Sequence, residues 1–234
     1  MKKNFPGKSG SRKGRLSFDV LYEDADLIVV EKPAGIITSF VGFRRKSHAP
    51  GLPSLEELVD DYLRKGQLKS RKKAWLVHRL DRETSGVIMF AKSESVAQEF
   101  RDSWNERTEK TYFAKVEGRL DEPFGVFESY LRDDPKTMKV SSVCDSSKGK
   151  FSSTEWKEIS YDADADVSLV EVALKTGRKN QIRVHFSEAG HPVVGDEKYG
   201  AKRADRLYLH SAKIAFVHPR TGRRVEVFSP RSIA

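Results

Sequence analysis

The sequence is poor in cysteine and contains no long apolar run. Cys144 is the only cysteine in 234 residues, which excludes an intrachain disulfide and a cysteine-based zinc site and favours a reduced compartment. No stretch reaches the roughly 18 apolar residues that a membrane-spanning helix needs. The basic N-terminus is not followed by the apolar segment of a secretory signal. We therefore expect a cytoplasmic protein that makes no membrane contact.

Motifs that hold metals or cofactors are also missing. The chain has no Gly-x-x-x-x-Gly-Lys phosphate loop and no His-Glu-x-x-His pair. Asp162, Asp164 and Asp166 alternate as in a calcium loop, but the later glycine and glutamate of such a loop are absent. We predict a polar turn at these aspartates, and a protein that needs neither a metal nor a cofactor.

Positive charge is in excess along the chain. Lys and Arg number 43 against 34 Asp and Glu, a formal net charge of +9, which favours a polyanionic partner such as nucleic acid. Residues 1–15 contain six cations, three glycines and no acid, a composition typical of a flexible segment. The composition does not change again further on. We predict a basic flexible tail over residues 1–15 and one domain over residues 16–234.

The pattern of apolar residues predicts an α+β fold. Helical spacing occurs over 54–66, where Ser54 and Glu57 can form a capping box, over 93–104 after a capping Ser93, and from Gly177 to about residue 190. Strand-like runs outnumber these helices without a repeating strand-helix-strand order, which favours a mixed or largely antiparallel sheet. The strand-like runs are 18–22, 27–30, 74–77, 87–91, 110–116, 125–131, 138–143, 151–160, 166–174, 207–217 and 223–228.

The segment His78–Gly86, with the sequence HRLDRETSG, is the strongest candidate for a site. It places Asp81 between Arg79 and Arg82, on a turn between two apolar runs. The neighbouring arginines favour an ionised carboxylate. We expect His78 to order the turn by hydrogen bonding. The alternative is a hairpin turn that carries a weak surface ion pair.

A second dense segment is Lys175–His185. Its glycine turn leads into a helix, so that backbone amides together with Arg178, Lys179 and Arg183 could bind an anion. If Arg183 reaches Asp81, its guanidinium would hold the carboxylate charged and oriented. The alternative is a helix start with solvent-facing cations. The residues alone suggest a carboxylate that acts on a bound polyanion, and leave open a glycosidase-like, a nuclease-like or a purely binding protein.

The His78–Gly86 segment resembles the signature of the RluA-type pseudouridine synthases, which isomerise uridine to pseudouridine in structured RNA. The resemblance extends over roughly residues 17–230. Further landmarks of that family match in order: Lys32-Pro33-Ala34-Gly35, Lys110-Thr111-Tyr112, Thr176–His185, Gly195-Asp196, Tyr199-Gly200, Leu209-His210 and His218-Pro219.

The resemblance implies a role for each site residue. Asp81 would be the catalytic aspartate, Tyr112 the ring that stacks on the target uracil, and Arg183 the basic partner of the aspartate. The implied fold is a curved, mixed and mostly antiparallel sheet with flanking helices and a central RNA-binding cleft. The nucleotide would be flipped out of its helix and isomerised without a cofactor. The candidates for contact with RNA are His78, Arg79, Arg82, Thr84, Arg178 and Gln181.

The sequence departs from the family pattern in two places. Asn180 stands where most relatives carry a histidine, which keeps hydrogen-bonding capacity but loses an imidazole. The tail is too short to encode the small N-terminal RNA-binding domain of many relatives, so we expect a compact member that acts as a monomer on ribosomal or transfer RNA. Two alternatives remain: a catalytically silent RNA-binding or ribosome-assembly protein on the same scaffold, and a hydrolase that releases the base.

Overall fold

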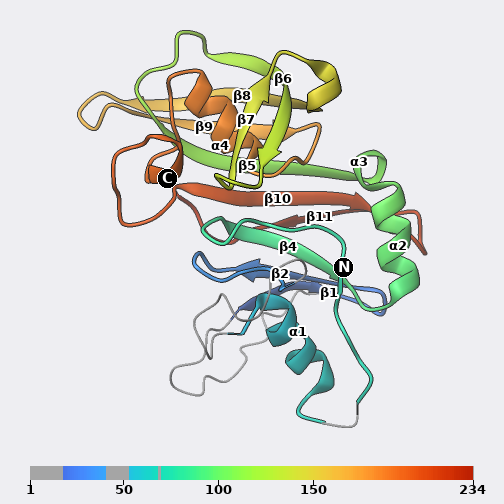
Figure 1. Cartoon of the computed structure of the whole chain (residues 1–234). Helices are drawn as coiled ribbons and strands as arrows, with labels where there is room; N and C mark the ends of the chain where they lie inside the picture. The colour runs from blue at the N-terminus through green and yellow to red at the C-terminus, as the bar shows by residue number, and fades with distance from the viewer. Residues whose placement is uncertain (1–17, 41–52, 68–69, 234) are drawn as a thin grey trace. The chain divides into compact units, whose positions relative to one another are not determined.

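The computed structural model describes residues 18–40, 53–67 and 70–233, and it has an α+β fold rich in strands (Figure 1). The chain forms two compact units that interleave in sequence: unit 1 comprises residues 1–108 and 214–230, and unit 2 comprises residues 109–213 and 231–234. The predicted tail, residues 1–15, lies outside the described residues. The expected single domain over 16–234 stays a prediction.

Strands of unit 1 form antiparallel pairs around a buried centre. β2 (Leu27–Lys32) pairs with β1 (Asp19–Glu23) on one side and with β4 (Ser85–Ala91) on the other. Every residue of β2 and β4 is buried, as expected for their apolar runs Leu27–Val30 and Val87–Ala91, and the buried residues include Glu31 and Lys32 at the end of β2. The short β3 (Trp75–Leu76) also pairs with β4. Residues 77–84, which contain Asp81, therefore connect two paired strands, as predicted.

Helices of unit 1 begin where their capping residues predict. α1 (Leu55–Arg64) has the complete Ser54–Glu57 capping box and ends at Lys65 in the left-handed conformation. α2 (Glu94–Asp102) begins after Ser93, whose side chain accepts from the Val96 amide. The expected extension to Trp104 is wrong. Ser103 has a non-helical backbone and its hydroxyl donates to the Glu99 carbonyl, so a separate short helix, α3 (Trp104–Arg107), begins there.

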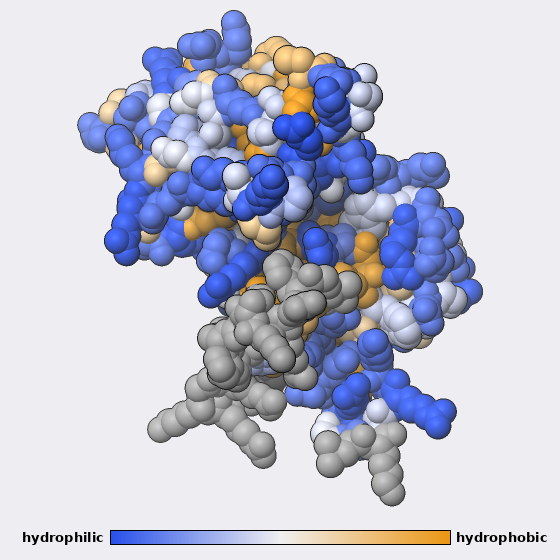
Figure 2. All heavy atoms as spheres, viewed as in Figure 1, coloured by the Kyte–Doolittle hydropathy of each residue, from blue (hydrophilic) through white to orange (hydrophobic). Residues whose placement is uncertain are grey.

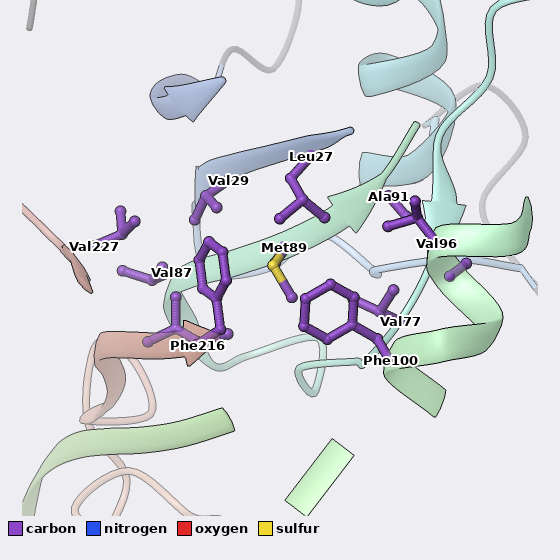
Figure 3. Close-up of a cluster of buried hydrophobic side chains, with 12 residues drawn as sticks. Leu27, Val29, Val77, Val87, Met89, Ala91, Val96, Phe100, Phe216 and Val227 are labelled. Carbon is purple, nitrogen blue, oxygen red and sulfur yellow. The ribbon is translucent and has the colours of Figure 1, made fainter. Parts of the chain in front are cut away.

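The core of unit 1 collects side chains from both of its sequence segments (Figure 3). Leu27, Val29 and Met89 from the first segment cluster with Phe216 and Val227, which lie on β10 (Leu209–Val217) and β11 (Arg224–Phe228). β10 starts in unit 2 and enters unit 1 at Ile214. Burial of this cluster joins residues about two hundred positions apart in the chain.

Unit 2 contains an antiparallel array with the strand order β5-β9-β8-β6-β7. The predicted strands are confirmed, although several are longer than their apolar runs indicate. Asp162 closes the hairpin between β8 and β9 by accepting from the amides of Asp164 and Ala165, which confirms the predicted polar turn. The strands are β5 (Thr108–Glu117), β6 (Phe124–Asp134), β7 (Lys139–Val143), β8 (Lys150–Asp162) and β9 (Val167–Leu174).

Helix α4 (Gln181–Glu188) packs against one face of this array. Residues directly opposite each other in a sheet share a face, and the register aligns Tyr112, Val172, Trp156 and Gly125 across four strands. Phe186 of α4 lies 6.1 Å from the Trp156 ring on this face. Tyr112 is therefore on the buried face. Residues on the opposite face, such as Phe124 and Phe151, are exposed.

The remaining described elements are the single turns η2 (Ser146–Lys148) and η3 (Glu197–Tyr199). Across the described residues, no helix combines the length and apolarity that a membrane crossing requires.

Candidate active site

Asp81 lies on a tight turn of unit 1. The Thr84 amide donates to the Asp81 carbonyl at 3.2 Å, which closes the turn, and the Asp81 side chain is half-buried. Just before it, the Thr38 hydroxyl donates to the Leu80 carbonyl at 2.8 Å and accepts from the Leu80 amide at 3.2 Å. Both backbone groups of the residue preceding Asp81 are thereby held by one buried side chain.

Lys32 braces the other side of the turn. This lysine is fully buried, and its Nζ donates to the carbonyls of Pro33, Arg82 and Thr84 at 2.7 to 3.0 Å. The Gly35 amide adds a bond to the Arg82 carbonyl at 2.9 Å. A buried ammonium is costly unless its donors are satisfied, and three carbonyls satisfy this one. The sequence reasoning missed this role, although a lysine at the end of an apolar strand was a signal for it.

His78 orders the same turn, as predicted. The Met89 amide donates to its Nε2 atom at 3.0 Å, so this nitrogen is an unprotonated acceptor. The imidazole also stacks on Trp104, with the ring centroids 4.7 Å apart. Both contacts tie the turn to β4 and α3. Contact of His78 with RNA stays a prediction.

The other residues of this loop that were predicted to contact RNA differ in their exposure to solvent. Arg79 and Arg82 are exposed, and Arg82 contacts Gly35 through its Nε and lies 3.4 Å from the Glu83 carboxylate. Thr84 is buried, and its backbone carries the contacts to Asp81 and Lys32. The two arginines are therefore accessible to a ligand, whereas the contacts of Thr84 within the protein order the loop.

Tyr112 and Lys110 lie on the same buried face of β5 in unit 2. Burial lowers the pKa of Lys110 to about 8. Its Nζ lies 3.4 Å from the position that a Cβ on Gly177 would occupy, so the lysine reaches the loop before α4. The sequence predicted the ring at position 112 but gave no role to the buried amine beside it.

Arg183 is held by Asp196 within unit 2. Its Nε and Nη2 donate to the two carboxylate oxygens at 2.6 and 2.7 Å, a bidentate pair whose side chains are 11% and 1% exposed. Sequence reasoning recognised Asp196 as a family landmark but missed this role. Gly195, with φ of +80°, makes the approach possible because a Cβ there would lie 2.0 Å from the Arg206 carbonyl oxygen. Asp81 belongs to the other unit, and its predicted contact with Arg183 stays a prediction.

Asn180 completes the surroundings of Arg183. It begins α4 in the left-handed conformation, which asparagine tolerates better than most residues. Its Oδ1 accepts from Arg183 Nη1 at 3.3 Å, and its Nδ2 donates to the Tyr199 hydroxyl at 2.9 Å. The Tyr199 ring lies 5.2 Å from the guanidinium. The amide therefore makes two hydrogen bonds at the position where the resemblance to the family implies an imidazole.

Gln181 and Arg178 differ in exposure, as Thr84 and the two arginines do in unit 1. Gln181 is buried, and its side chain bonds Thr176, the Arg178 amide, Ser153 and Thr154. It fixes the loop that leads into α4. Arg178 is exposed, and its Nε donates to the Phe151 carbonyl at 3.0 Å. Of the two, only the arginine offers its side chain to solvent.

One group among the described residues has the spacing of metal ligands. Ligand atoms of Asp24, Asp26 and His218 lie within 4.8 Å of one another. The Asp24 carboxylate already accepts from the Tyr22 hydroxyl, from two backbone amides and from His218. These contacts account for the cluster as a brace between the β1–β2 and β10–β11 turns.

Known proteins are similar to this chain in sequence and in fold. Residues 26–188 match the family model described as RNA pseudouridylate synthase. The chain is 32% identical to ribosomal large subunit pseudouridine synthase C of Vibrio cholerae over 96% of its length and 69% of that protein. It is 34% identical to ribosomal large subunit pseudouridine synthase D of Borreliella burgdorferi, covering 87% of this chain and 62% of that one.

Solved structures show the same fold. Human RNA pseudouridylate synthase domain containing 4 matches with a TM-score of 0.71 at 21% identity, over 91% of this chain and 88% of that one. The chain spans 62% to 69% of the length of the curated relatives named above. The sequence match, which covers the braced Asp81 turn and the helix that carries Arg183, shows that this chain belongs to the RNA pseudouridylate synthase family.

Proposed function

We propose that the protein isomerises uridine to pseudouridine in a structured RNA, without a cofactor. The observation that carries this proposal is the Asp81 turn within the family match: Asp81 is half-buried, Lys32 and Thr38 bind the backbone of the turn on either side of it, and His78 ties the turn to β4. A reacting group must be held in one geometry to be effective. Such bracing suits a reacting carboxylate better than a surface ion pair.

In the proposed reaction the bond between ribose C1′ and uracil N1 breaks, and a bond between C1′ and C5 forms. N1 gains a proton and C5 loses one, so the substrate and product are isomers and no external oxidant or reductant is consumed. Asp81 acts on the ribose, as a nucleophile at C1′ or as a base toward a ribose proton. Tyr112 provides a flat surface for the uracil, and Arg183 is the cationic partner of the reacting carboxylate.

The exposed Arg79 and Arg82 would bind phosphates on either side of the flipped nucleotide. Relatives whose names refer to the ribosomal large subunit favour ribosomal RNA over transfer RNA as the substrate. We further propose that the protein acts as a monomer in the cytoplasm, where ribosomal RNA is found in bacteria.

Asp81→Asn tests the proposal because it keeps the shape of the side chain and removes its charge. We expect binding of unmodified ribosomal RNA to persist and pseudouridine formation to fall by more than about 10²-fold. Mass spectrometry of nuclease digests measures the product. Glu83→Gln is the matched control, since Glu83 is an exposed carboxylate in the same loop, and it should retain full activity.

Three outcomes would contradict the proposal. A fully active Asp81→Asn protein would remove the aspartate from the mechanism. Release of free uracil with abasic RNA would identify a hydrolase. Tight RNA binding by the wild-type protein, without pseudouridine in any unmodified ribosomal or transfer RNA, would identify a binding protein.

A further inference from the structure

Unit 2 carries an aromatic pair on the sheet face opposite α4, in which Phe151 is exposed and Tyr130 is half-buried. Tyr130 of β6 and Phe151 of β8 are direct partners in the ladder, and their rings meet edge to face with centroids 5.8 Å apart. Phe151 is 44% exposed. Figure 2 shows hydrophobic residues at the surface in the region where Figure 1 places β6 and β8. Core packing does not account for an exposed ring of this size.

A cation is fixed at the edge of this pair. β9 ends at Leu174, opposite Thr154, and the chain continues along β8 through a bond from the Lys175 amide to the Ser153 carbonyl. Arg178 follows, and its Nε donates to the carbonyl of Phe151. Among the described residues, no acceptor pairs with its two Nη atoms. The guanidinium is thus oriented by the residue whose ring is exposed, with its remaining donors available.

The charge around the ring favours an anionic ligand. Lys150, which precedes Phe151, is exposed and forms no ion pair with a described residue. Among the acids close to the pair in sequence, Asp133 binds Lys179 at 2.8 Å and Glu155 binds Lys175 at 3.0 Å. Glu128 is exposed on the same face, so that one acid faces the two cations Lys150 and Arg178. An exposed aromatic face beside unpaired cations is the combination that proteins use to bind single-stranded nucleic acid.

We propose that Phe151, Tyr130 and Arg178 form a subsite for an unpaired nucleotide of the substrate RNA, on the sheet face opposite the one that carries Tyr112. The base stacks on Phe151, and Arg178 binds the adjoining phosphate through its Nη atoms. This inference rests on the proposed function. Ser153, which accepts from Gln181 at the start of α4, is two residues from Phe151, about 7 Å along the strand. The subsite lies on the sheet face opposite α4, so the RNA strand would reach it past the segment Lys175–Arg178 that follows β9, and not along the face that carries Arg183.

A binding experiment tests the subsite without requiring turnover. Phe151→Trp places a fluorescent ring at the subsite, and Phe124→Trp places one at the 70% exposed Phe124 on the same face of β6. Adding a single-stranded RNA dodecamer should quench the first indole and leave the second nearly unchanged. Equal quenching of both, or quenching of neither, would overturn the proposal. Quenching of neither indole is also the result expected if this face binds a protein instead of RNA.

Steady-state kinetics give the second measurement. Phe151→Ala should weaken RNA binding and raise KM by roughly fivefold or more, with kcat little changed, since a stacked base contributes ~1–3 kcal/mol. Phe151→Tyr should restore binding, and Phe124→Ala should have no effect. Arg178→Gln should lower the slope of log binding constant against log salt by about 0.7. A wild-type KM for Phe151→Ala would contradict the subsite.

The two proposals fail differently. Quenching of the Phe151→Trp protein without any pseudouridine formation would leave the subsite in place and remove the activity. Loss of activity in Asp81→Asn, with no quenching at position 151, would keep the activity and remove the subsite.

Discussion

At the scale of single residues, the Arg183–Asp196 pair is the contact on which the candidate site of unit 2 depends most. Both side chains are buried, and both oxygens of Asp196 are used by the guanidinium. A buried charge that loses its partner is strongly unfavourable, because neither water nor another group replaces the lost contact. The pair therefore connects the stability of α4 with the orientation of Arg183.

Asp196→Asn should lower the free energy of unfolding by about 3–5 kcal/mol, because it leaves the Arg183 charge buried without a counter-charge. Urea unfolding followed by circular dichroism measures this change. Asp133→Asn, which removes a more exposed pair with Lys179, is the control and should cost no more than about 1 kcal/mol. Equal losses in the two variants would contradict this account of the buried pair.

Loop residues could be predicted from the sequence only in part. His78, Asp81 and Arg82 lie within nine residues of each other, so their placement on one turn follows from local pattern. The brace from Lys32 crosses about 50 positions of the chain, and the partner of Arg183 lies 13 positions away across a loop. Contacts of this kind depend on tertiary packing and leave no periodic signal.

At the scale of elements, the strands and helices followed from apolar period and capping. Ser54 and Ser93 predicted two helix starts correctly because the cap is a local interaction. The break at Ser103 was missed, since the apolar spacing continues through Trp104 while the Ser103 hydroxyl binds the Glu99 carbonyl. The lengths of β6 and β8 were underestimated because the strands continue into polar residues at their ends, such as Arg132–Asp134 in β6 and Lys150 and Asp162 in β8.

Two glycines of unit 2 allow the cost of a strained backbone to be measured apart from the cost of a steric clash. Gly195 and Gly190 have similar φ angles of +80° and +89°, but a Cβ would meet the Arg206 carbonyl at 2.0 Å in the first and nothing within 4 Å in the second. Gly190→Ala should cost about 1–2 kcal/mol from the left-handed conformation alone. Gly195→Ala should cost clearly more and reduce activity, because Asp196 follows it. Thermal unfolding and turnover measure both effects, and equal stability losses would be the contrary result.

At the scale of the whole molecule, buried neutral histidines make the fold sensitive to acid. Burial lowers the pKa of His210 to about 4, assisted by the charges of Arg206 and Arg231, and burial also lowers the pKa of His185. An unfolded histidine titrates near pH 6.5, so below that pH the unfolded chain binds more protons than the folded one. Stability must therefore fall as the pH decreases from about 6.5 toward 4.

Unfolding free energies measured at pH 7 and pH 5 should reveal this loss before most carboxylates titrate. His210→Gln should be less stable than wild type at pH 7 but should lose less on acidification. Parallel pH profiles for the two proteins would show that His210 does not contribute.

The excess of positive charge should appear in the salt dependence of RNA binding. With a formal net charge of +9 and exposed Arg79 and Arg82 beside Asp81, binding should weaken steeply as salt increases. Each lost phosphate contact should reduce the logarithmic slope by about 0.7–0.9. Gel-shift titrations of the Arg79→Gln, Arg82→Gln double variant measure this change. Arg224→Gln is the control, because that arginine is already paired with Glu226. An RNA-binding constant that does not change with salt would contradict phosphate binding by Arg79 and Arg82.

The interleaving of the two units has a consequence for how the protein is made. Ile214, Phe216 and Val227 complete the cluster that begins with Leu27 and Val29, so the cluster members that precede residue 108 emerge from the ribosome uncovered on the side that these three side chains occupy. They stay so until translation reaches the last strand. A nascent chain arrested before residue 214 would therefore expose the strands that flank Asp81, and chaperone binding to that intermediate should exceed binding to the completed chain.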